Sequence, residues 1–492
     1  MKISNQELIY VLEEANKKHL NRNYLVNPYF RISKLTPETF TKYKYIENKS
    51  IDLFKVILVV ILLSISLSKL FLQFLLSLIF YYQHIIFRKD IKKYDVLFIS
   101  HALGENVSRR RDDQFFALMP NKLSQKNSKV AVIYTNHELL RYKANLKRLK
   151  SKDLNIGSYL LPKFLTPLEN LDFFKTILPK SYHCLRLSIK YREQDPLKSQ
   201  FLFFGFQNFF ERETYSNYAI AQRVKTFSRI SKISNLFFTF EGQSYEQFVM
   251  DSLIENNLNI KFIFYQHSPL TEAHIGVKDF IKSQKELYTI LVTGHYYKKF
   301  LGSMTESKDI IVIGSNKHSK HITLKNPEAC RIVSNRILFA PEGTRTDSLN
   351  FMKLIKFLAS NNADFKYVLR LHPNLRLTNR IRWYLYHLNK KECFSISLNS
   401  LEDDLCSSQI LFYRSSAVGI QSLKHEILPI FYTSINYDNL NVIPDNLSFV
   451  RKSYCPSEAL VLLTSLNGVK RNRVLDNFFS VLNYNELDRI IN

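Results

Sequence analysis

Glycine and cysteine are scarce in this sequence, and each shortage argues against a class of site. Only 11 of the 492 residues are Gly, so glycine-rich phosphate loops are nearly absent and an anion would have to be held by hydroxyl and basic side chains. The five cysteines are odd in number, lie far apart and form no CxxC pair. This pattern indicates neither a disulfide framework nor a zinc site and favours a reducing, cytoplasmic setting.

Acidic residues are also in deficit. The chain has 69 Lys and Arg against 43 Asp and Glu, a net charge of +26, which attracts nucleic acid, anionic lipid headgroups or phosphorylated substrates. The basic residues are spread along the chain, without zinc-finger spacing, a ribonucleoprotein motif or an Arg-rich tail. We therefore expect no nucleic-acid partner. The chain has 492 residues, of which 46% are hydrophobic. It is therefore long enough for two or three domains, each with its own core.

One long apolar stretch, residues 56–87, follows a polar region at 1–50 that does not resemble a signal peptide. The stretch could cross a hydrocarbon layer of roughly 30 Å, but Lys69 and Gln73 fall near its middle. Basic residues flank both ends, so charge gives no orientation. We predict that residues 51–90 form a hydrophobic helical segment that attaches the chain to a membrane, in the plane of the surface or as a hairpin. A single span and a buried helix of a soluble domain are the alternatives.

After residue 90, short apolar runs alternate with helical periodicity. The first series predicts strands at 94–100, 129–134, 236–240, 260–265, 289–293 and 310–313. The second predicts strands ILFAP, KYVLRL, CFSIS, QILFY and LPIFY, separated by helices at 348–358, 377–388, 401–406 and 417–424. The stretch at 140–230 is poorly patterned, and no internal repeat is visible. The predicted fold class is α/β, with two Rossmann-like doubly wound domains facing across a cleft.

Polar residues follow two strands of the second series. Strand KYVLRL runs into His372 and Pro373, where Arg370 and His372 can donate to a phosphate. Strand QILFY runs into Arg414, Ser415 and Ser416 at the start of a helix. Hydroxyl and N–H groups at that position can bind a phosphate, although a serine there can also simply cap the helix.

Together, the segments RLHP and YRSSAVGIQSLKHEILPIFY resemble the donor site of GT-B glycosyltransferases. They are particularly similar to bacterial capsule, teichoic-acid-type and sialyltransferase-like enzymes, whose His-Pro and serine motifs hold the donor nucleotide and its phosphates. Upstream, EGQSYE at 241–246, YQHS at 265–268, VTG at 292–294 and VIGS at 312–315 resemble motifs of bacterial surface-carbohydrate biosynthesis proteins. The resemblance covers about residues 94 to 435.

The patterning of the chain and the resemblance together predict a division into five parts. They are a polar region at 1–50, a membrane-associated segment at 51–90, an acceptor domain at 91–325, a nucleotide-sugar donor domain at 326–470 and a C-terminal helical tail at 471–492. The resemblance also implies the residues of the donor site, which are Glu342, Gly343, Thr344, Arg370, His372, Pro373, Arg414, Ser415 and Ser416.

Inverting transfer needs a general base from the first domain. Glu241 and His267 each follow a predicted strand and are the catalytic candidates; each could instead make a structural hydrogen bond. His101, Glu105 and Asp112 are weaker candidates. Gln421 stands where many retaining GT-B enzymes carry a donor-binding Glu, which favours inversion. The run Glu402–Asp404 opens a predicted helix and lacks DxD spacing, so we expect no metal and no cofactor.

The implied activity is transfer of a sugar or sugar-like unit from a nucleotide-activated donor to a growing surface polysaccharide or lipid-linked glycan. The implied partners are the nucleotide sugar, the glycan or lipid-linked acceptor and the inner-membrane surface, and the implied location is the cytoplasmic face of a bacterial inner membrane. The motifs do not distinguish CMP-linked donors, CDP-alditols and other nucleotide sugars.

Two other functions fit part of the sequence. The segment at 341–345, PEGTR, resembles a motif of glycerophospholipid acyltransferases, and His274 with Asp279 supplies their HxxxxD pair. In that chemistry the Asp orients the His, which deprotonates a glycerol hydroxyl. This alternative leaves RLHP and RSSAVG unexplained. The other alternative is a non-catalytic subunit that binds or exports polysaccharide.

Overall fold

The fold is taken from a computed structural model of the chain. It describes residues 53–102, 113, 115–126, 128–136, 146–147, 156–271, 274, 276–277, 280–281, 288–304, 309–315, 335–372, 375–423, 425, 427–433, 440–444, 450–465 and 478–491. The predicted polar region at 1–50 lies outside this set, as do Glu105, Asp112, Asp279 and Pro373.

The first unit is built on a seven-stranded sheet in the order β3-β2-β1-β4-β5-β6-β7, in which every pair is parallel. Strands β4 and β6 are buried at every position, as expected when both faces of a parallel sheet are covered. The strands are β1 (Val96–Ala102), β2 (Val130–Asn136), β3 (Gly157–Leu160), β4 (Asn235–Thr239), β5 (Lys261–Gln266), β6 (Tyr288–Val292) and β7 (Ile310–Val312).

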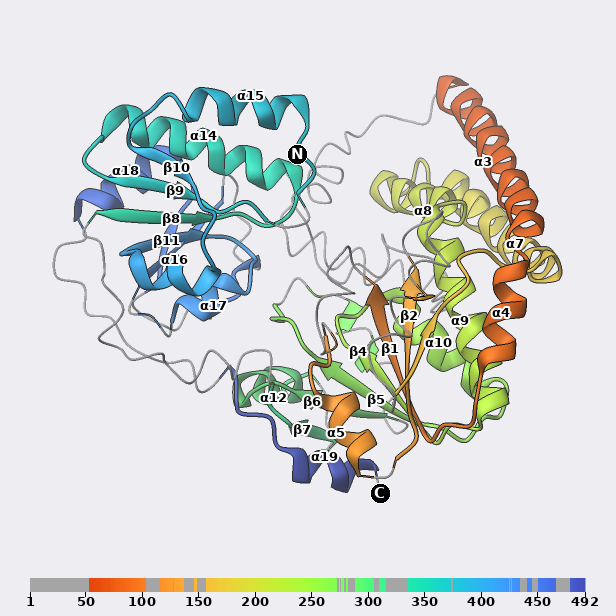
Figure 1. The fold of residues 1–492 in the computed structure, drawn as a ribbon. Helices are drawn as coiled ribbons and strands as arrows, with labels where there is room; N and C mark the ends of the chain where they lie inside the picture. Colours follow the sequence, from red (N-terminus) through yellow and green to blue (C-terminus); the bar gives the residue numbers. More distant parts are fainter. Residues whose placement is uncertain are drawn as a thin grey trace.

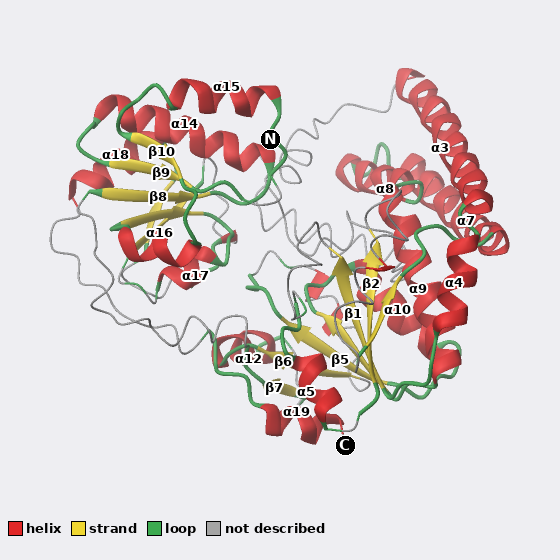
Figure 2. Ribbon diagram, in the orientation of Figure 1, coloured by secondary structure: helices red, strands yellow, loops and turns green. Residues whose placement is uncertain are grey.

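Helices cover both faces of this sheet (Figure 2). Helices α9 and α10 pack on one face and α5 and α19 on the other, each with its own cluster of buried apolar side chains. The helices of this unit are α5 (Met119–Gln125), α7 (Pro167–Lys190), α8 (Pro196–Asn208), α9 (Arg212–Ser231), α10 (Ser244–Ile254), α12 (His295–Gly302) and α19 (Tyr484–Ile491).

The second unit is a six-stranded parallel sheet in the order β10-β9-β8-β11-β12-β13. Counted from its own first strand this is 3-2-1-4-5-6, the Rossmann order. Its strands are β8 (Arg336–Ala340), β9 (Lys366–Leu369), β10 (Phe394–Ile396), β11 (Ile410–Tyr413), β12 (Leu428–Tyr432) and β13 (Arg451–Ser453), and its helices are α14 (Arg345–Asn361), α15 (Asn379–Leu388), α16 (Leu401–Ser407), α17 (Val418–Ser422) and α18 (Pro456–Ser465).

The end of the chain returns to the first unit (Figure 1). Ser480 N–H donates to Thr293 O at 2.7 Å, and Asn483 N–H donates to Ile313 O at 2.8 Å. Beyond this connection, α19 buries Leu487 and Ile490 against the strands of the first sheet. The predicted C-terminal helix is therefore present, and it contributes to the core of the first unit.

The predicted hydrophobic segment is helical and consists of α3 (Leu53–Ile79) and α4 (Tyr82–Asp90). Helix α4 docks on the first unit: His84 Nε2 lies 2.7 Å from Phe164 O, and Phe87 is buried beside Tyr159 and Phe227. Within the described residues, no single helix is long and apolar enough to cross a membrane. The segments Phe71–Ile79 and Tyr82–Asp90, which are bent by 57° relative to each other, are long and apolar enough for a span only when they are taken together.

The α/β class and the two doubly wound sheets are confirmed, with each predicted strand within two residues of an observed one. The second sheet has six strands rather than the five predicted, because β13 adds an edge strand. Strand β3 and helices α7, α8 and α9 occupy much of the stretch that lacked a clear pattern. The cleft between the two units stays a prediction.

Candidate active site

The candidate residues follow strands at or beside the point where the strand order of each sheet reverses. In the second sheet, β8 lies between β9 and β11, so the chain leaves β8 and β11 toward opposite sides. Ligands of doubly wound sheets bind in the crevice at this switch point, beyond the carboxyl ends of the strands. Glu342–Thr344 follow β8, Arg370 and His372 follow β9, and Arg414–Ser416 follow β11. Eight of the nine predicted donor residues therefore lie at one edge, and Pro373 is outside the described residues.

A hydrogen bond spans this switch point. The Ser415 hydroxyl, after β11, donates to Glu342 Oε2, after β8, at 2.5 Å. Beneath it, the Arg414 guanidinium bonds to Asp347 Oδ1 at 3.2 Å, and both side chains are buried. The other oxygen of Asp347 accepts the backbone N–H of Glu342 at 2.6 Å. Arg414 thus braces the loop after β8 from inside the domain.

The buried Asp347 carboxyl has an altered acidity. Burial raises its pKa to about 6, although the positive charge of Arg414 acts in the opposite direction. Glu342, whose negative charge also raises this pKa, is the neighbouring carboxylate at the site. The two carboxyl groups therefore have different roles: Asp347 is buried beneath the loop, and Glu342 is bonded to Ser415 at the site.

Glycine at position 343 allows His372 to approach the loop. A Cβ atom at this position would lie 2.6 Å from His372 Nδ1, well inside van der Waals contact. The imidazole after β9 therefore packs directly on the backbone of the Glu342–Thr344 loop. This contact gives a specific reason for one of the chain's few glycines.

Two further predicted donor residues, Thr344 and Arg370, also have structural partners. The Thr344 hydroxyl accepts the N–H of Asp347 at 3.2 Å and caps helix α14. Arg370 bonds to Asp404 Oδ2 and to Asn399 O, each at 2.8 Å, and its side chain is 27% exposed. The contact of either residue with a donor stays a prediction.

The candidate base residues of the first unit lie together after β4 and β5. His267 Nε2 is 3.3 Å from Glu241 Oε1, and the Ser268 hydroxyl donates to the same oxygen at 2.6 Å. Burial alone would raise the pKa of Glu241, but the positive charge of His267 and the Ser268 hydrogen bond lower it to about 2. The Glu241 side chain is 31% exposed and that of His267 only 7%. Glu241 is thus the member of the pair that a substrate can reach.

Aromatic and polar residues hold this pair from the β1 side. The Asp113 carboxylate accepts the N–H groups of Phe115 and Phe116 at 2.8 and 2.9 Å. The Phe115 ring then meets His267 edge-on, with ring centres 4.9 Å apart. His101, a weaker candidate, bonds to Thr135 at 2.7 Å and contacts the Tyr245 hydroxyl at 3.2 Å. His101 is therefore tied into the support of the site.

Three solved structures resemble this chain in fold. They are the UDP-GlcNAc 2-epimerase of Methanocaldococcus jannaschii in complex with UDP-GlcNAc and UDP (TM-score 0.47, 11% identity, 81% of this chain and 99% of that one), a glycosyltransferase of Rickettsia africae (0.42, 13%, 81% and 98%) and the trehalose 6-phosphate synthase of Burkholderia multivorans (0.43, 10%, 81% and 95%). No protein-family model and no curated protein matches the chain. At these identities the likenesses concern the fold alone.

The structure also reveals a correspondence between the two units that the sequence analysis missed. Each has a Glu-Gly pair after a central strand and an acid five residues after the Glu: Glu241 and Glu246, and Glu342 and Asp347. In both loops that acid accepts the backbone N–H of the Glu, and a serine after the neighbouring strand bonds to the Glu carboxylate. The pattern EGxxx(E/D), present twice, was the available signal.

The acyltransferase pattern is not favoured. Its two motifs fall on different sheets, because His274 follows β5 and the PEGTR segment follows β8. His274 is buried, and its Nδ1 atom accepts the backbone N–H of Thr271 at 3.0 Å. The ring is thus held by its own turn, and Asp279 lies outside the described residues.

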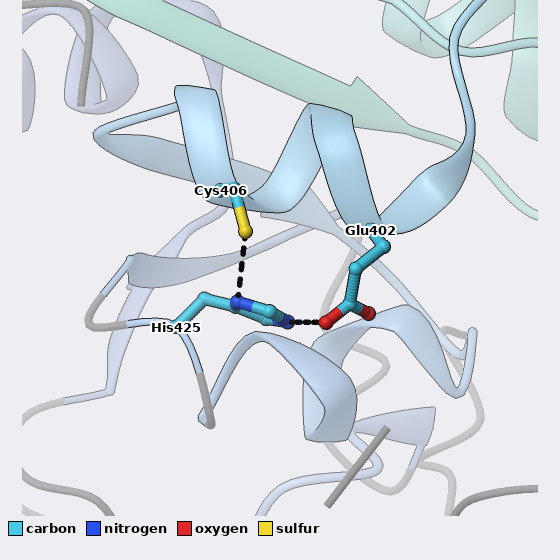
Figure 3. Close-up of side chains that lie close together, drawn as sticks. All are labelled: Glu402, Cys406 and His425. Carbon is cyan, nitrogen blue, oxygen red and sulfur yellow. Dashed lines mark hydrogen bonds and ion pairs between the residues drawn. The ribbon is translucent and has the colours of Figure 1, made fainter. Parts of the chain in front are cut away.

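The acidic run at 402–404 opens helix α16, as predicted. Ser400 caps the helix by accepting the Asp403 N–H at 3.1 Å. Asp404 points into the domain, where it binds Arg336 and Arg370 at 2.9 and 2.8 Å. Glu402 instead belongs to a group with Cys406 and His425 (Figure 3), the group of potential metal ligands found among the described residues.

Proposed function

We propose that this protein is a GT-B-type glycosyltransferase that transfers a sugar, or a sugar-like unit, from a nucleotide-activated donor to a glycan or lipid-linked acceptor of the bacterial cell surface. One observation carries the proposal. The Ser415–Glu342 hydrogen bond, with His372 packed on Gly343, joins three loops at the switch point of a sheet with the Rossmann strand order.

On this proposal, the second unit binds the donor nucleotide. His372 and the Ser416 hydroxyl supply hydrogen bonds to the phosphates, the Ser415 hydroxyl does so once it turns from Glu342 to a phosphate oxygen, and Arg370 adds positive charge at the same edge. These groups stabilise the nucleotide phosphate as the sugar leaves, which is the role that a metal ion fills in other transferases. The proposed reaction is therefore inverting and independent of a metal.

The first unit supplies the base. Glu241 is exposed enough to accept a proton from the acceptor hydroxyl, while the buried His267 and the half-buried Ser268 hold its carboxylate in place. Its low pKa keeps it ionised at neutral pH but makes it a weak base. An anionic donor bound nearby would raise that pKa, so the base gains strength when the donor is present.

The binding half of the proposal is tested by thermal denaturation with a panel of CMP, CDP, UDP and GDP. A nucleotide at 100 times its Kd stabilises the folded state by about 2.7 kcal/mol. We expect one nucleotide to raise the melting temperature of the wild type, and the increase to disappear in His372→Ala and Ser415→Ala. The matched control is His387→Ala, on the outer helix α15. No shift with any nucleotide, or an equal shift in all variants, contradicts the proposal.

We also propose that α3 and the start of α4 bind the protein to the cytoplasmic face of the inner membrane. Large apolar side chains along these helices are exposed: Ile61, Ile65, Leu67, Phe71, Leu72, Leu75, Leu78, Ile79, Tyr81, Tyr82 and Ile85. Helix α7, which contacts α3, exposes Leu168, Leu171, Leu178, Tyr182 and Ile189. Exposed apolar area of this extent on neighbouring helices is typical of a membrane surface or a protein interface, and the basic chain favours an anionic bilayer.

Flotation with lipid vesicles tests this attachment. The wild type should float with vesicles that contain 30% anionic phospholipid, and Phe71→Glu with Ile79→Glu should abolish flotation because two charges enter the apolar face. Leu398→Glu, at a position that is 96% exposed on the second unit, is the control and should float normally. Equal flotation of all three proteins would count against the proposed surface.

A further inference from the structure

Cys406, His425 and Glu402 form a chain of side-chain contacts that the proposed transfer reaction does not use (Figure 3). Cys406 Sγ lies 3.5 Å from His425 Nδ1, and His425 Nε2 lies 3.3 Å from Glu402 Oε1. Glu402 and Cys406 are one turn apart on α16, and His425 comes from the segment between α17 and β12. The imidazole therefore stands between the thiol and the carboxylate.

We infer that Cys406 is a nucleophilic thiol, activated by His425 and Glu402, and that it is a site of modification by low-molecular-weight disulfides. A thiol beside an imidazole gives up its proton more readily, and the thiolate is the form that reacts. A carboxylate on the far ring nitrogen orients the imidazole and stabilises the imidazolium. The three groups have the order that this chemistry requires.

Burial and exposure suit the same roles. The His425 side chain is 2% exposed, so the ring is held in place and shielded from water, whereas Glu402 is 33% exposed. Cys406 is partly exposed, so a small disulfide can reach its sulfur. By contrast, Cys184 is buried and burial raises its pKa, which makes it unreactive.

The contact geometry favours this chemistry over a metal site. A zinc ion bonds at about 2.0–2.3 Å and takes a single ring nitrogen of a histidine. Here the sulfur contacts Nδ1 and the carboxylate contacts Nε2. An ion held by the sulfur and Nδ1 would therefore leave the carboxylate on the far side of the ring, and an ion held by the carboxylate and Nε2 would leave the sulfur there. The arrangement matches a proton relay along the ring.

The reaction is a thiol–disulfide exchange. The Cys406 thiol passes its proton to His425, and the thiolate attacks one sulfur of the small disulfide. A new S–S bond forms on Cys406 while the bond within the small disulfide breaks. The departing thiolate takes the proton from the imidazolium and leaves as a thiol, so no further oxidant is required.

Modification of Cys406 would disturb the proposed donor site. Asp404 lies two residues before Cys406 on the seven-residue helix α16, and it binds Arg336 and Arg370 from its buried position. A mixed disulfide on Cys406 would displace this short helix and with it the partner of Arg370. This consequence rests on the proposed function, whereas the reactivity of the thiol does not.

The test is competitive labelling of the full-length protein with limiting iodoacetamide at pH 6.5, read out by peptide mass spectrometry. Cys455 and Cys393, which are also partly exposed, are the internal references. Cys406 should react at least tenfold faster than Cys455, and oxidised glutathione should form its mixed disulfide first on Cys406. Glu402→Gln and His425→Asn should reduce that advantage, while Asp403→Asn, exposed on the same helix, should retain it.

Three results separate the possibilities. If Cys406 reacts within twofold of Cys455 in the wild type, the inference is wrong. It is also wrong if elemental analysis finds zinc in the purified protein and Cys406 becomes reactive only after chelation. Because His425→Asn could disturb folding, the test of thiol activation relies on Glu402→Gln, whose position is more exposed. A fast Cys406 in a protein that binds no nucleotide would leave the reactive thiol in place and contradict only the proposed function.

Discussion

At the scale of single residues, the candidate site depends on a few close approaches between loops. The Glu342 carboxylate faces Ser415 and its backbone faces Asp347, while Gly343 leaves room for His372. The contacts of Ser415 and His372 join segments that follow different strands, whereas the Asp347 contact lies within the connection from β8 to α14. Packing therefore sets the positions of the polar groups at the site. A small increase in side-chain volume there should weaken nucleotide binding.

Gly343→Ala is expected to weaken nucleotide binding because the new Cβ would displace His372 from the loop. Loss of one hydrogen bond to a charged group costs about 1.5–3 kcal/mol, or roughly tenfold to a hundredfold in Kd. Isothermal titration with the nucleotide found by thermal denaturation measures this change. Gly302→Ala, where nothing lies within 4 Å of the added Cβ, should bind normally. Equal affinities in the two variants would exclude this role of Gly343.

Asp347 should give the folded protein a measurable pH dependence. Burial raises its pKa to about 6 from an ordinary value of 3.8, so between these values the folded state holds a proton that the unfolded state has lost. This contribution to stability therefore increases as the pH falls through 6 and is complete below 3.8. Between pH 7 and pH 5 the wild type should gain about 1 kcal/mol relative to Asp347→Asn. Urea unfolding at the two pH values measures it, and an unchanged difference contradicts the shift.

At the scale of elements, the sequence located most strands because buried parallel strands are short, continuous apolar runs. It missed β3 (GSYL) and β13 (RKS), two short edge strands without such a run. It also missed α8, whose apolar residues do not gather on one side of the helix and so give no helical stripe. The strand-end motifs were visible, but the hydrogen bond between Ser415 and Glu342 joins residues 73 positions apart. Only the strand order brings them together.

Helix α19 is expected to be essential to the first unit although it is the last element of the chain. Leu487 is 1% exposed and packs in the cluster that contains Val96, Phe98 and Val130. Leu487→Ala should lower the free energy of unfolding by about 2–5 kcal/mol. Val481→Ala, at a position that is 62% exposed, should change it by less than about 0.5 kcal/mol. Similar values for the two variants would show that the return of the chain does not stabilise the fold.

At the scale of the whole molecule, two parallel sheets present corresponding Glu-Gly loops at their switch points, yet the loops are supported differently. In the first unit, Glu241 is partly exposed and backed by His267; in the second, Glu342 is bonded to Ser415 above the buried Arg414–Asp347 pair. The first arrangement suits a base and the second suits a binding loop. This difference is the basis for the proposal that one unit binds the acceptor and the other binds the donor.

The most direct test of that proposal is nucleotide release from a panel of nucleotide sugars, measured by chromatography in the presence of a membrane extract that supplies acceptors. We predict release with one donor class in the presence of EDTA. We further expect at least a hundredfold slower release for Glu241→Gln, with nucleotide binding retained, and loss of both binding and release for His372→Ala. Binding of a nucleotide sugar without release from any donor, or release that Glu241→Gln leaves unchanged, would contradict the proposal.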